Sequence, residues 1–278
     1  SNKIVATDVS YDSLGNVLTK DGVGIYQYGG SQTCAGVSGV QAGPHAVTSI
    51  TPSTFGLKNT TYCYDANGNM IKGDGRSIEY SYFDKPTQIQ KGTFTTYLDY
   101  DAERNRYRRV DDNAGQQTTY TYVGAYEKVE HPDGKVEERH YIGDFALVTK
   151  ETMATQTTTF ERYLHKDHLG STTVITDDLG NILEEHSFDP WGKRRAPNLP
   201  TLEEMVGTPF DMMIYPERFN FTLTALGLTS QYTNKGFTGH EQMDGVGLIH
   251  MGGRVYDAEI GRFLSADPFI QDRTDLQN

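Results

Sequence analysis

The sequence contains very little cysteine and no long apolar run. Only Cys34 and Cys63 occur among 278 residues, which excludes a disulfide framework but leaves open one bridge between them. No stretch of about eighteen apolar residues is present, so the sequence predicts no membrane-spanning helix. No charged and then apolar signal segment opens the chain either. Since Ser1-Asn2 resembles a tag remnant, this absence decides little about targeting.

Positive charge is also scarce. The chain has 25 Lys and Arg residues against 37 Asp and Glu residues, a formal net charge of −12. Because phosphate attraction requires a basic face, this balance argues against non-specific nucleic-acid binding. One local basic run spans Arg104 to Arg109. We interpret it as the solvated side of one strand and not as a ligand patch.

Tyrosine and glycine, by contrast, are abundant. The chain has 18 Tyr, 12 Phe and 29 Gly residues, with a hydrophobic fraction of 36%. This composition is typical of many short, half-exposed strands and argues against a large helical core. We therefore predict an all-β protein.

A Tyr-Asp-x-x-Gly turn recurs along the chain. Aspartate at the first turn position can cap backbone amides, and glycine supplies the positive φ of the exit. A unit of strand, turn and strand cannot bury its own apolar face, so the copies must stack into a curved strip of antiparallel hairpins. Such an array predicts a scaffold or a wall. Clear copies are 11–16 and 64–69, and looser ones are 83–86, 100–105, 177–181, 188–192 and 256–262.

Composition and periodicity divide the chain into five regions. Strict alternation of apolar and polar residues in 77–82, 95–100 and 118–123 predicts hairpins with one wet face. The segment His131–Lys135 predicts a hairpin turn, and Thr201 with Glu204 predicts the capped start of a short helix over 201–206. The regions are a turn-and-strand unit (1–28), a Gly/Pro-rich connection without long strands (29–60), a hairpin array (61–192), an insertion with the short helix (193–235) and a C-terminal segment (236–278).

The C-terminal half carries an ordered set of specific motifs. They are HKDHLGS at 165–171, GFTGHE at 236–241, GRVYD at 253–257 and GRFLSADP at 261–268. In this order they resemble the conserved core region of RHS (rearrangement hot spot) proteins, which include bacterial polymorphic toxins and Tc toxin C components. The upstream turns resemble the YD repeats of the same family, so the resemblance covers nearly the whole chain.

The resemblance implies a fold and a function. Members wind a β strip into a hollow shell, which the core region closes. In bacterial members a toxin follows the core, lies inside the shell and is cut from it by an aspartyl autoprotease. That site uses two Asp-Pro motifs and an arginine; by position, the first aspartate matches Asp267 and the arginine is best matched by Arg254. The implied partners are the chain's own C-terminal toxin, upstream RHS repeats and a delivery component. The implied location is secreted or at the bacterial cell surface, and no cofactor is implied.

The sequence departs from the family pattern in two places. Phe269-Ile270 follows Asp267-Pro268, where many members have Ile, Leu or Phe followed by Gly. No second Asp-Pro follows Asp267-Pro268 before Asn278. Because one carboxylate must act as base while another acts as acid, residues 1–278 alone are expected to be proteolytically inactive and to carry no toxin domain.

Ordinary structural interpretations compete with these assignments. Asp267 is also typical of a plain turn, and Arg254 of a structural partner for a buried carboxylate. Metal binding is disfavoured because the His-Glu pair at 240–241 has no second histidine at the required spacing; Asp167, between two histidines, predicts a hydrogen-bonded turn. Phosphate binding is disfavoured because Gly22 to Gly30 lacks a following helix and lysine. The histidines and the glutamate weighed as metal ligands are His165, His168, His240, Glu241 and His250.

Two further functional hypotheses remain open at the level of sequence. Exposed tyrosines on repeated strands would suit stacking on sugar rings, which favours a cell-surface adhesion or carbohydrate-binding module, although packing of tyrosines across strands is the simpler interpretation. A self-contained hydrolase is disfavoured because the motifs supply no set of nucleophile, base and orienting residue. Unpaired strand edges would favour dimerisation or a partner that adds a strand.

Overall fold

A computed structural model describes residues 8–32, 34, 36–37, 40–53, 59–195 and 229–267. These residues are almost entirely antiparallel β-structure, which confirms the predicted fold class. By contacts, the chain divides into two compact units, Ser1–Gln116 with Met251–Asn278, and Gln117–His250. The helix predicted at 201–206 lies outside the described residues. Within the described part of the chain, no helix has the length and apolar character needed to cross a membrane.

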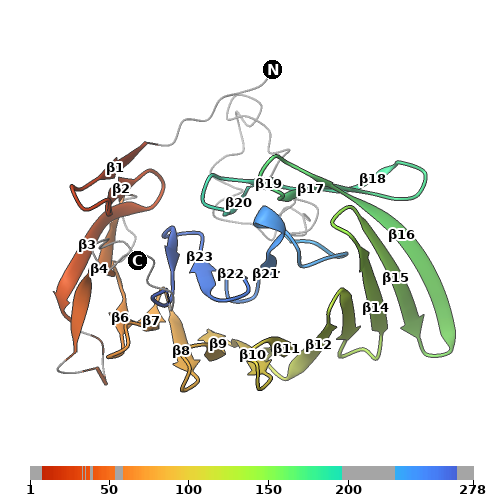
Figure 1. The fold of residues 1–278 in the computed structure, drawn as a ribbon, viewed down its shortest axis with the longest axis horizontal. Coiled ribbons are helices and arrows are strands. Elements are labelled where there is room, and N and C mark those ends of the chain that lie inside the picture. Colours follow the sequence, from red (N-terminus) through yellow and green to blue (C-terminus); the bar gives the residue numbers. More distant parts are fainter. Residues whose placement is uncertain are drawn as a thin grey trace, which may run out of the picture. The chain divides into compact units, whose positions relative to one another are not determined.

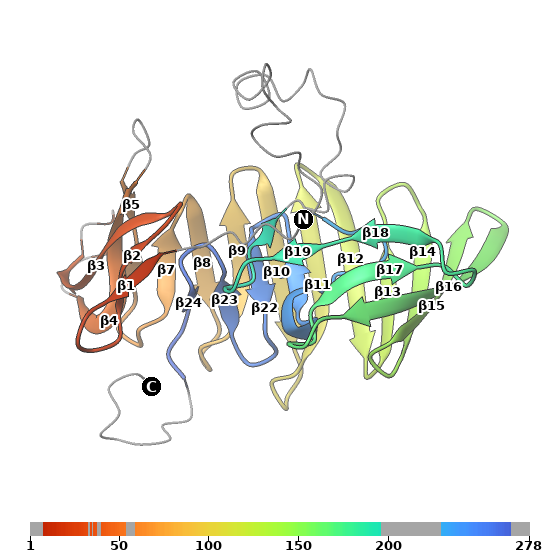
Figure 2. The same ribbon diagram turned by 90° about the horizontal axis from the view of Figure 1, so that it is seen from above.

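In the first unit, strands pair antiparallel in chain order (Figure 2). One sheet contains β1 (Val9–Tyr11), β2 (Val17–Lys20), β3 (Gly24–Ser31), β4 (Gln41–Pro52) and β5 (Thr60–Thr61). The next strands are β6 (Cys63–Tyr64), β7 (Met70–Gly73), β8 (Arg76–Tyr80), β9 (Pro86–Lys91), β10 (Phe94–Tyr100) and β11 (Arg106–Asn113). A hairpin of β23 (Val255–Asp257) and β24 (Arg262–Phe263) belongs to the same unit.

The second unit is built in the same way (Figure 1). Its strands pair in chain order from β12 to β18: β12 (Gln116–Val123), β13 (Tyr126–Glu130), β14 (Val136–Ile142), β15 (Ala146–Met153), β16 (Gln156–Lys166), β17 (Thr172–Thr176) and β18 (Ile182–Glu185). Short hairpins follow, β19 (Ser187–Phe188) with β20 (Arg194–Arg195) and β21 (Glu241–Met243) with β22 (Leu248–His250), and a 3-10 turn, η2 (Phe237–Gly239), precedes β21.

The prediction that residues 29–60 form a connection without long strands is wrong. β4 runs for 12 residues and pairs with β3. Gly29 and Gly30 take positive φ values of 65° and 81°, and the register shifts there, so β3 bends at a bulge and does not end. Pro44 lies between the paired residues Ala42 and Val47, where no ladder hydrogen bond requires its missing N–H.

The Asp-x-x-Gly turns have the predicted geometry. At the first copy, Asp12 N donates to Asn16 O at 2.9 Å and Gly15 N donates to Asp12 O at 3.1 Å. The Asp12 carboxylate also accepts from the backbone N–H groups of Leu14 and Asn16, both at 2.8 Å. The same backbone pattern recurs in the turns that begin at 65, 101, 167, 177 and 189 and, with histidine at its first position, at 131.

The copy placed at 83–86 is wrong in register. That turn begins at Ser81, whose N–H donates to Lys85 O at 2.9 Å, and Asp84 takes the glycine position with φ 60°. The Asp84 carboxylate instead accepts from the side-chain amides of Asn67 and Asn69, at 2.8 and 2.7 Å. It therefore ties one turn to the preceding turn of the array, a role that the local pattern does not predict.

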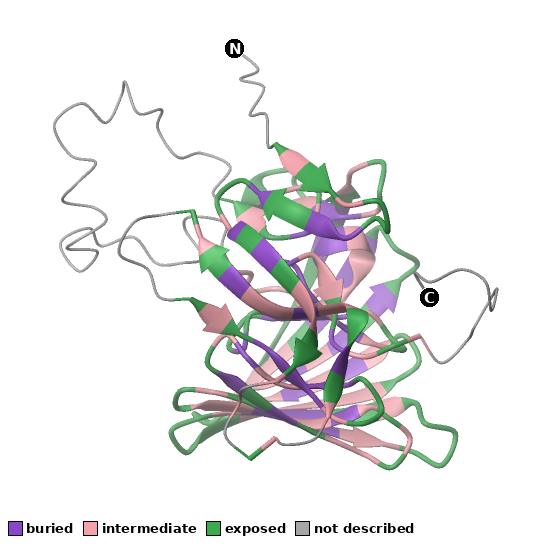
Figure 3. Ribbon diagram, turned by 90° about the vertical axis from the view of Figure 1, so that its left-hand side faces the viewer, coloured by how far each residue is buried: buried purple, intermediate pink, exposed green. Residues whose placement is uncertain are grey.

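Buried and exposed residues alternate along the strands (Figure 3). In the first unit Ile78 and Ile89 pair across β8 and β9, 4% and 0% exposed. In the second unit the core cluster contains Tyr141, Leu147, Leu164 and Ile175, with Tyr232 packed against it. Each sheet thus has one packed side and one wet side, as the alternation predicts.

The solvated interpretation of the basic run is wrong at one position. Arg109 is 2% exposed and pairs with Asp111, to which its Nε donates at 2.9 Å. Thr96 Oγ1 donates to the same carboxylate at 2.8 Å. A carboxylate two residues further along the same strand satisfies the guanidinium, which lets this arginine lie on the packed side.

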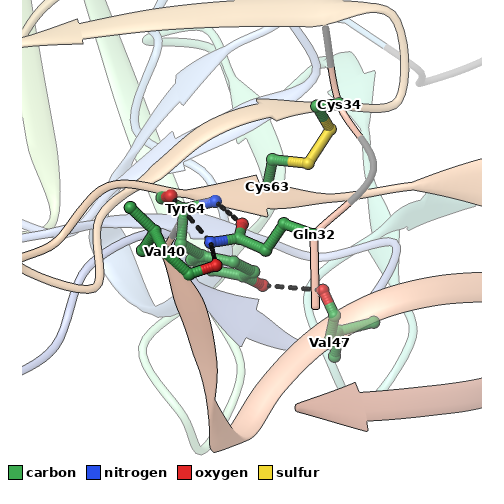
Figure 4. Close-up of a disulfide and its surroundings, with 6 residues drawn as sticks. All are labelled: Gln32, Cys34, Val40, Val47, Cys63 and Tyr64. Carbon is green, nitrogen blue, oxygen red and sulfur yellow. Dashed lines mark hydrogen bonds between the residues drawn. A yellow bond between two sulfur atoms is a disulfide. The ribbon is translucent and has the colours of Figure 1, made fainter. Parts of the chain in front are cut away.

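A disulfide joins Cys34 to Cys63 and settles the bridge that the sequence leaves open (Figure 4). Beside it, Gln32 Nε2 donates to Val40 O at 3.2 Å and to Tyr64 O at 3.0 Å. The Tyr64 hydroxyl donates to Val47 O at 2.9 Å. The bridge and these bonds fasten the end of β3 to β6, across the segment that contains β4.

Candidate functional site

The last motifs of the sequence form a hairpin in the first unit. Tyr256 on β23 pairs with Phe263 on β24, and Asp257 pairs with Arg262. The connecting turn closes when Gly261 N donates to Asp257 O at 2.9 Å, and the Asp257 carboxylate caps Glu259 N at 3.0 Å. Gly261 has φ 68°, a conformation that favours glycine. This hairpin carries the candidate site at its open end.

The two candidate catalytic residues lie in contact. Arg254 Nη2 is 2.8 Å from Asp267 Oδ2, and the two side chains are 24% and 28% exposed. Arg254 stands just before β23 and Asp267 follows β24, so the hairpin brings together residues that are separated along the chain. A guanidinium at this distance donates a hydrogen bond to the carboxylate and fixes its orientation. The interpretation of Arg254 as partner of a buried carboxylate does not fit, because Asp267 is partly exposed.

Aromatic rings support the arginine. The Arg254 Cζ lies 3.8 Å from the centroid of the Phe263 ring, within the range of a cation–π contact. The Phe263 ring in turn packs against Tyr256, with ring centroids 5.2 Å apart and planes inclined at 61°. The guanidinium of the ion pair therefore rests on the Phe263 ring, which packs in turn against Tyr256 of the other strand.

The N-terminal turn-and-strand unit holds the turn of this hairpin. Lys20 Nζ, on a residue 3% exposed, donates to the carbonyl oxygens of Ala258 and Glu259 at 3.2 and 2.9 Å. The Tyr26 hydroxyl donates to Ile260 O at 3.3 Å. Buried polar groups of this kind are costly unless they are paired, so these bonds fix the turn against β2 and β3.

A buried ion pair anchors the hairpin to β8. Arg76 Nη1 lies 2.6 Å from Asp257 Oδ2, and the two side chains are 2% and 0% exposed. Arg76 Nη2 also lies 3.0 Å from the more exposed Asp74. Burial raises the pKa of Asp257, while the Arg76 guanidinium opposes that rise. Since Asp257 is fully buried and paired with Arg76, we assign it a structural role, which is to hold the hairpin against β8.

The remaining motifs meet in the second unit. Thr238 N donates to Ser171 Oγ and Thr172 N donates to Gly236 O, both at 3.1 Å, which joins HKDHLGS to GFTGHE. A Cβ at Gly192 would lie 2.4 Å from the Phe237 ring. The glycine therefore allows a third motif, the turn at 188–192, to pack closely against GFTGHE. The three motifs therefore build one packed junction.

The side chains weighed as metal ligands have other partners. His165 contacts Thr176, His240 contacts Thr238 at 2.8 Å, and Glu241 accepts from the Tyr122 hydroxyl at 2.6 Å. In the part of the chain that the structure describes, no group of three His, Cys, Asp or Glu residues could hold a metal ion. Asp167 accepts from the N–H groups of Leu169 and Ser171, which confirms that it is a turn residue.

A charged cluster lies on the packed side of β13 and β14. Arg139 pairs with Glu127 at 2.8 Å and with Glu137 at 2.6 Å, and Lys135 and His131 approach Glu137 to 2.6 and 2.9 Å. Burial by itself raises the pKa of Glu137, but the hydrogen bond from His131 and the charges of Arg139 and Lys135 outweigh it and hold the pKa well below its usual range.

Stability of the second unit is expected to fall in acid. Because the pKa of Glu137 is lower in the folded than in the unfolded state, its contribution is complete at neutral pH. It declines as pH falls below about 4, near the unfolded value. Glu137→Gln is expected to remove roughly 2 kcal/mol of the difference between pH 7 and pH 3, measured by urea unfolding at each pH. The exposed Glu161→Gln is the matched control; equal pH slopes for the two variants would contradict the assignment.

Comparisons with known proteins support the fold. No family model matches the chain, and no curated protein matches it significantly. Solved structures do match: a crystal structure of TcdB2-TccC3-Cdc42 has a TM-score of 0.58 at 16% identity, over 94% of this chain and 14% of that one. The Photorhabdus luminescens Tc holotoxin pore with a mutated TccC3 has a TM-score of 0.56 at 17% identity, over 94% of this chain and 14% of that one.

A third match is to TcdB2-TccC3 without its hypervariable C-terminal region, with a TM-score of 0.52 at 15% identity, over 96% of this chain and 16% of that one. At such identities the likeness concerns the fold. The chain has the β fold of these Tc toxin structures, in agreement with the fold that the RHS resemblance predicts. It spans only about a seventh of their length.

Proposed function

We propose that this chain is the C-terminal part of an RHS shell in a secreted toxin, and that the shell encloses and presents a C-terminal toxin segment. In this function the β strip is a wall, the hairpin of β23 and β24 ends it, and Asp267 supplies one half of an aspartyl autoprotease site. The partners are the chain's own toxin segment, upstream RHS repeats and a delivery component.

The observation that carries the proposal is the ion pair of Arg254 and Asp267. It occurs within the GRVYD and GRFLSADP motifs, on a chain whose fold matches Tc toxin structures over 94% of its length. The disulfide of Cys34 and Cys63 favours a secreted or cell-surface location, because such bonds persist in oxidising compartments and are rare in the cytosol.

The proposed chemistry requires a second carboxylate. An ionised aspartate takes a proton from water, which attacks the peptide carbonyl carbon, while a protonated aspartate donates to the departing amine. The two carboxyl groups share one proton, because two negatively charged carboxylates at short distance repel each other. In this proposal Arg254 orients the Asp267 carboxylate for acid–base catalysis. Chain beyond Asn278 supplies the second aspartate.

Self-cleavage is the test of this function. The naturally extended chain is expected to give two fragments by intact mass, and Asp267→Asn is expected to leave it whole. Asp178→Asn, in an exposed turn, is the matched control and should leave cleavage unchanged. An uncut parent chain would overturn the proposal and favour a YD-repeat adhesion module. Its glycan contacts would then be made by exposed rings such as Tyr82, which is 93% exposed.

A further inference from the structure

We propose that Phe263 is a positioning residue for the Arg254–Asp267 pair, and that it acts through the face of its ring. This inference rests on the proposed autoprotease function and extends it to a residue that the Asp-Pro and arginine pattern does not include. Phe263 touches the guanidinium of Arg254, and Arg254 touches the carboxylate of Asp267.

The guanidinium of Arg254 makes two contacts, one with an aromatic ring and one with a carboxylate. The Phe263 ring centroid lies 3.8 Å from Arg254 Cζ, whereas Nη2, 2.8 Å from Asp267 Oδ2, makes the ion pair. A ring below a planar guanidinium leaves the N–H donors at its edge free for a carboxylate. Arg254 is 24% exposed and has a long side chain with many rotamers, so the ring contact limits the orientations in which Nη2 can point.

The ring is itself held in place by the hairpin. Phe263 and Tyr256 are direct cross-strand partners, and their rings pack at 5.2 Å. Phe263 is 37% exposed, whereas the adjacent Leu264 is 1% exposed and supplies the apolar burial at this end of β24. Core packing therefore accounts for Leu264 but not for an aromatic ring at 263.

Two substitutions separate a ring effect from a volume effect. In the naturally extended chain, Phe263→Leu keeps an apolar side chain but removes the π face, and cleavage is expected to slow roughly 3- to 10-fold. Phe263→Tyr keeps the face, and its rate is expected to stay within about twofold of the parent. Equal rates for the leucine variant and the parent would overturn the inference, as would equal slowing in both variants.

A second measurement does not depend on cleavage. In the chain of residues 1–278, the Nε–H signal of Arg254 can be followed by NMR and assigned by its loss in Arg254→Lys. The relaxation of this group is expected to report faster motion in Phe263→Leu and unchanged motion in Phe263→Tyr. Unchanged motion in the leucine variant would overturn the inference. A parent chain that never cuts contradicts the proposed function, and the NMR result still decides the role of Phe263.

Discussion

Replacing Asp257 with asparagine is expected to lower the free energy of unfolding of the first unit by about 3–5 kcal/mol. Asp257 is 0% exposed and lies 2.6 Å from Arg76, whose side chain is 2% exposed. The substitution leaves the Arg76 charge buried and removes its fully buried carboxylate partner, while Asp74, which also pairs with it, is partly exposed. Urea unfolding followed by circular dichroism measures the loss.

The controls distinguish a lost ion pair from a general loss of packing. Removing both charges at once, as Arg76→Met with Asp257→Leu, is expected to recover most of the stability, because no uncompensated charge remains. Asp99→Asn, which breaks an exposed pair with Arg108, is expected to cost less than about 1 kcal/mol. A cost below about 1 kcal/mol for Asp257→Asn would show that water or other groups satisfy Arg76.

Local sequence predicts the strands and turns of this fold well. It fails where contacts between distant residues decide which of several possible turns or strands forms. The turn that begins at Asp65 follows from that aspartate and from Gly68, three positions further along the chain. The turn at Ser81 does not, because a serine takes the aspartate position and Asp84 is used to bind the neighbouring turn. Glycine and proline in 29–60 look like strand breakers, yet a bulge between β3 and β4 accommodates them.

The candidate site is predicted only in part, for a similar reason. Asp267 and Arg254 are found through motifs, and the hairpin that joins them is short. Residues that support the site are remote: Arg76 is 181 positions from Asp257, and Lys20 is 238 positions from Ala258. A lysine in a strand predicts exposure, and only the carbonyl oxygens of a distant turn make its burial favourable. No local pattern contains that information.

The disulfide is a covalent link within a β strip whose strands are short. Cys34 follows β3 and Cys63 begins β6, with a sequence separation of 29. The linked segment contains β4, which pairs with both β3 and β5. Linking its two ends removes much of the chain entropy of this segment in the unfolded state, and hence favours the folded pairing of β3 with β4.

Removing the disulfide by Cys34→Ala with Cys63→Ala is expected to cost about 3–4 kcal/mol, the loop-closure entropy for a segment of this length. The cost should appear in urea unfolding of oxidised protein and disappear when parent and variant are compared under dithiothreitol. Two alanines differ little in volume from two reduced cysteines, so reduced parent is the matched control. If oxidised parent and variant unfold together, the bridge adds no stability. If they differ by the expected amount, the first unit reaches its full stability only in an oxidising compartment, which is the compartment that the proposed shell requires.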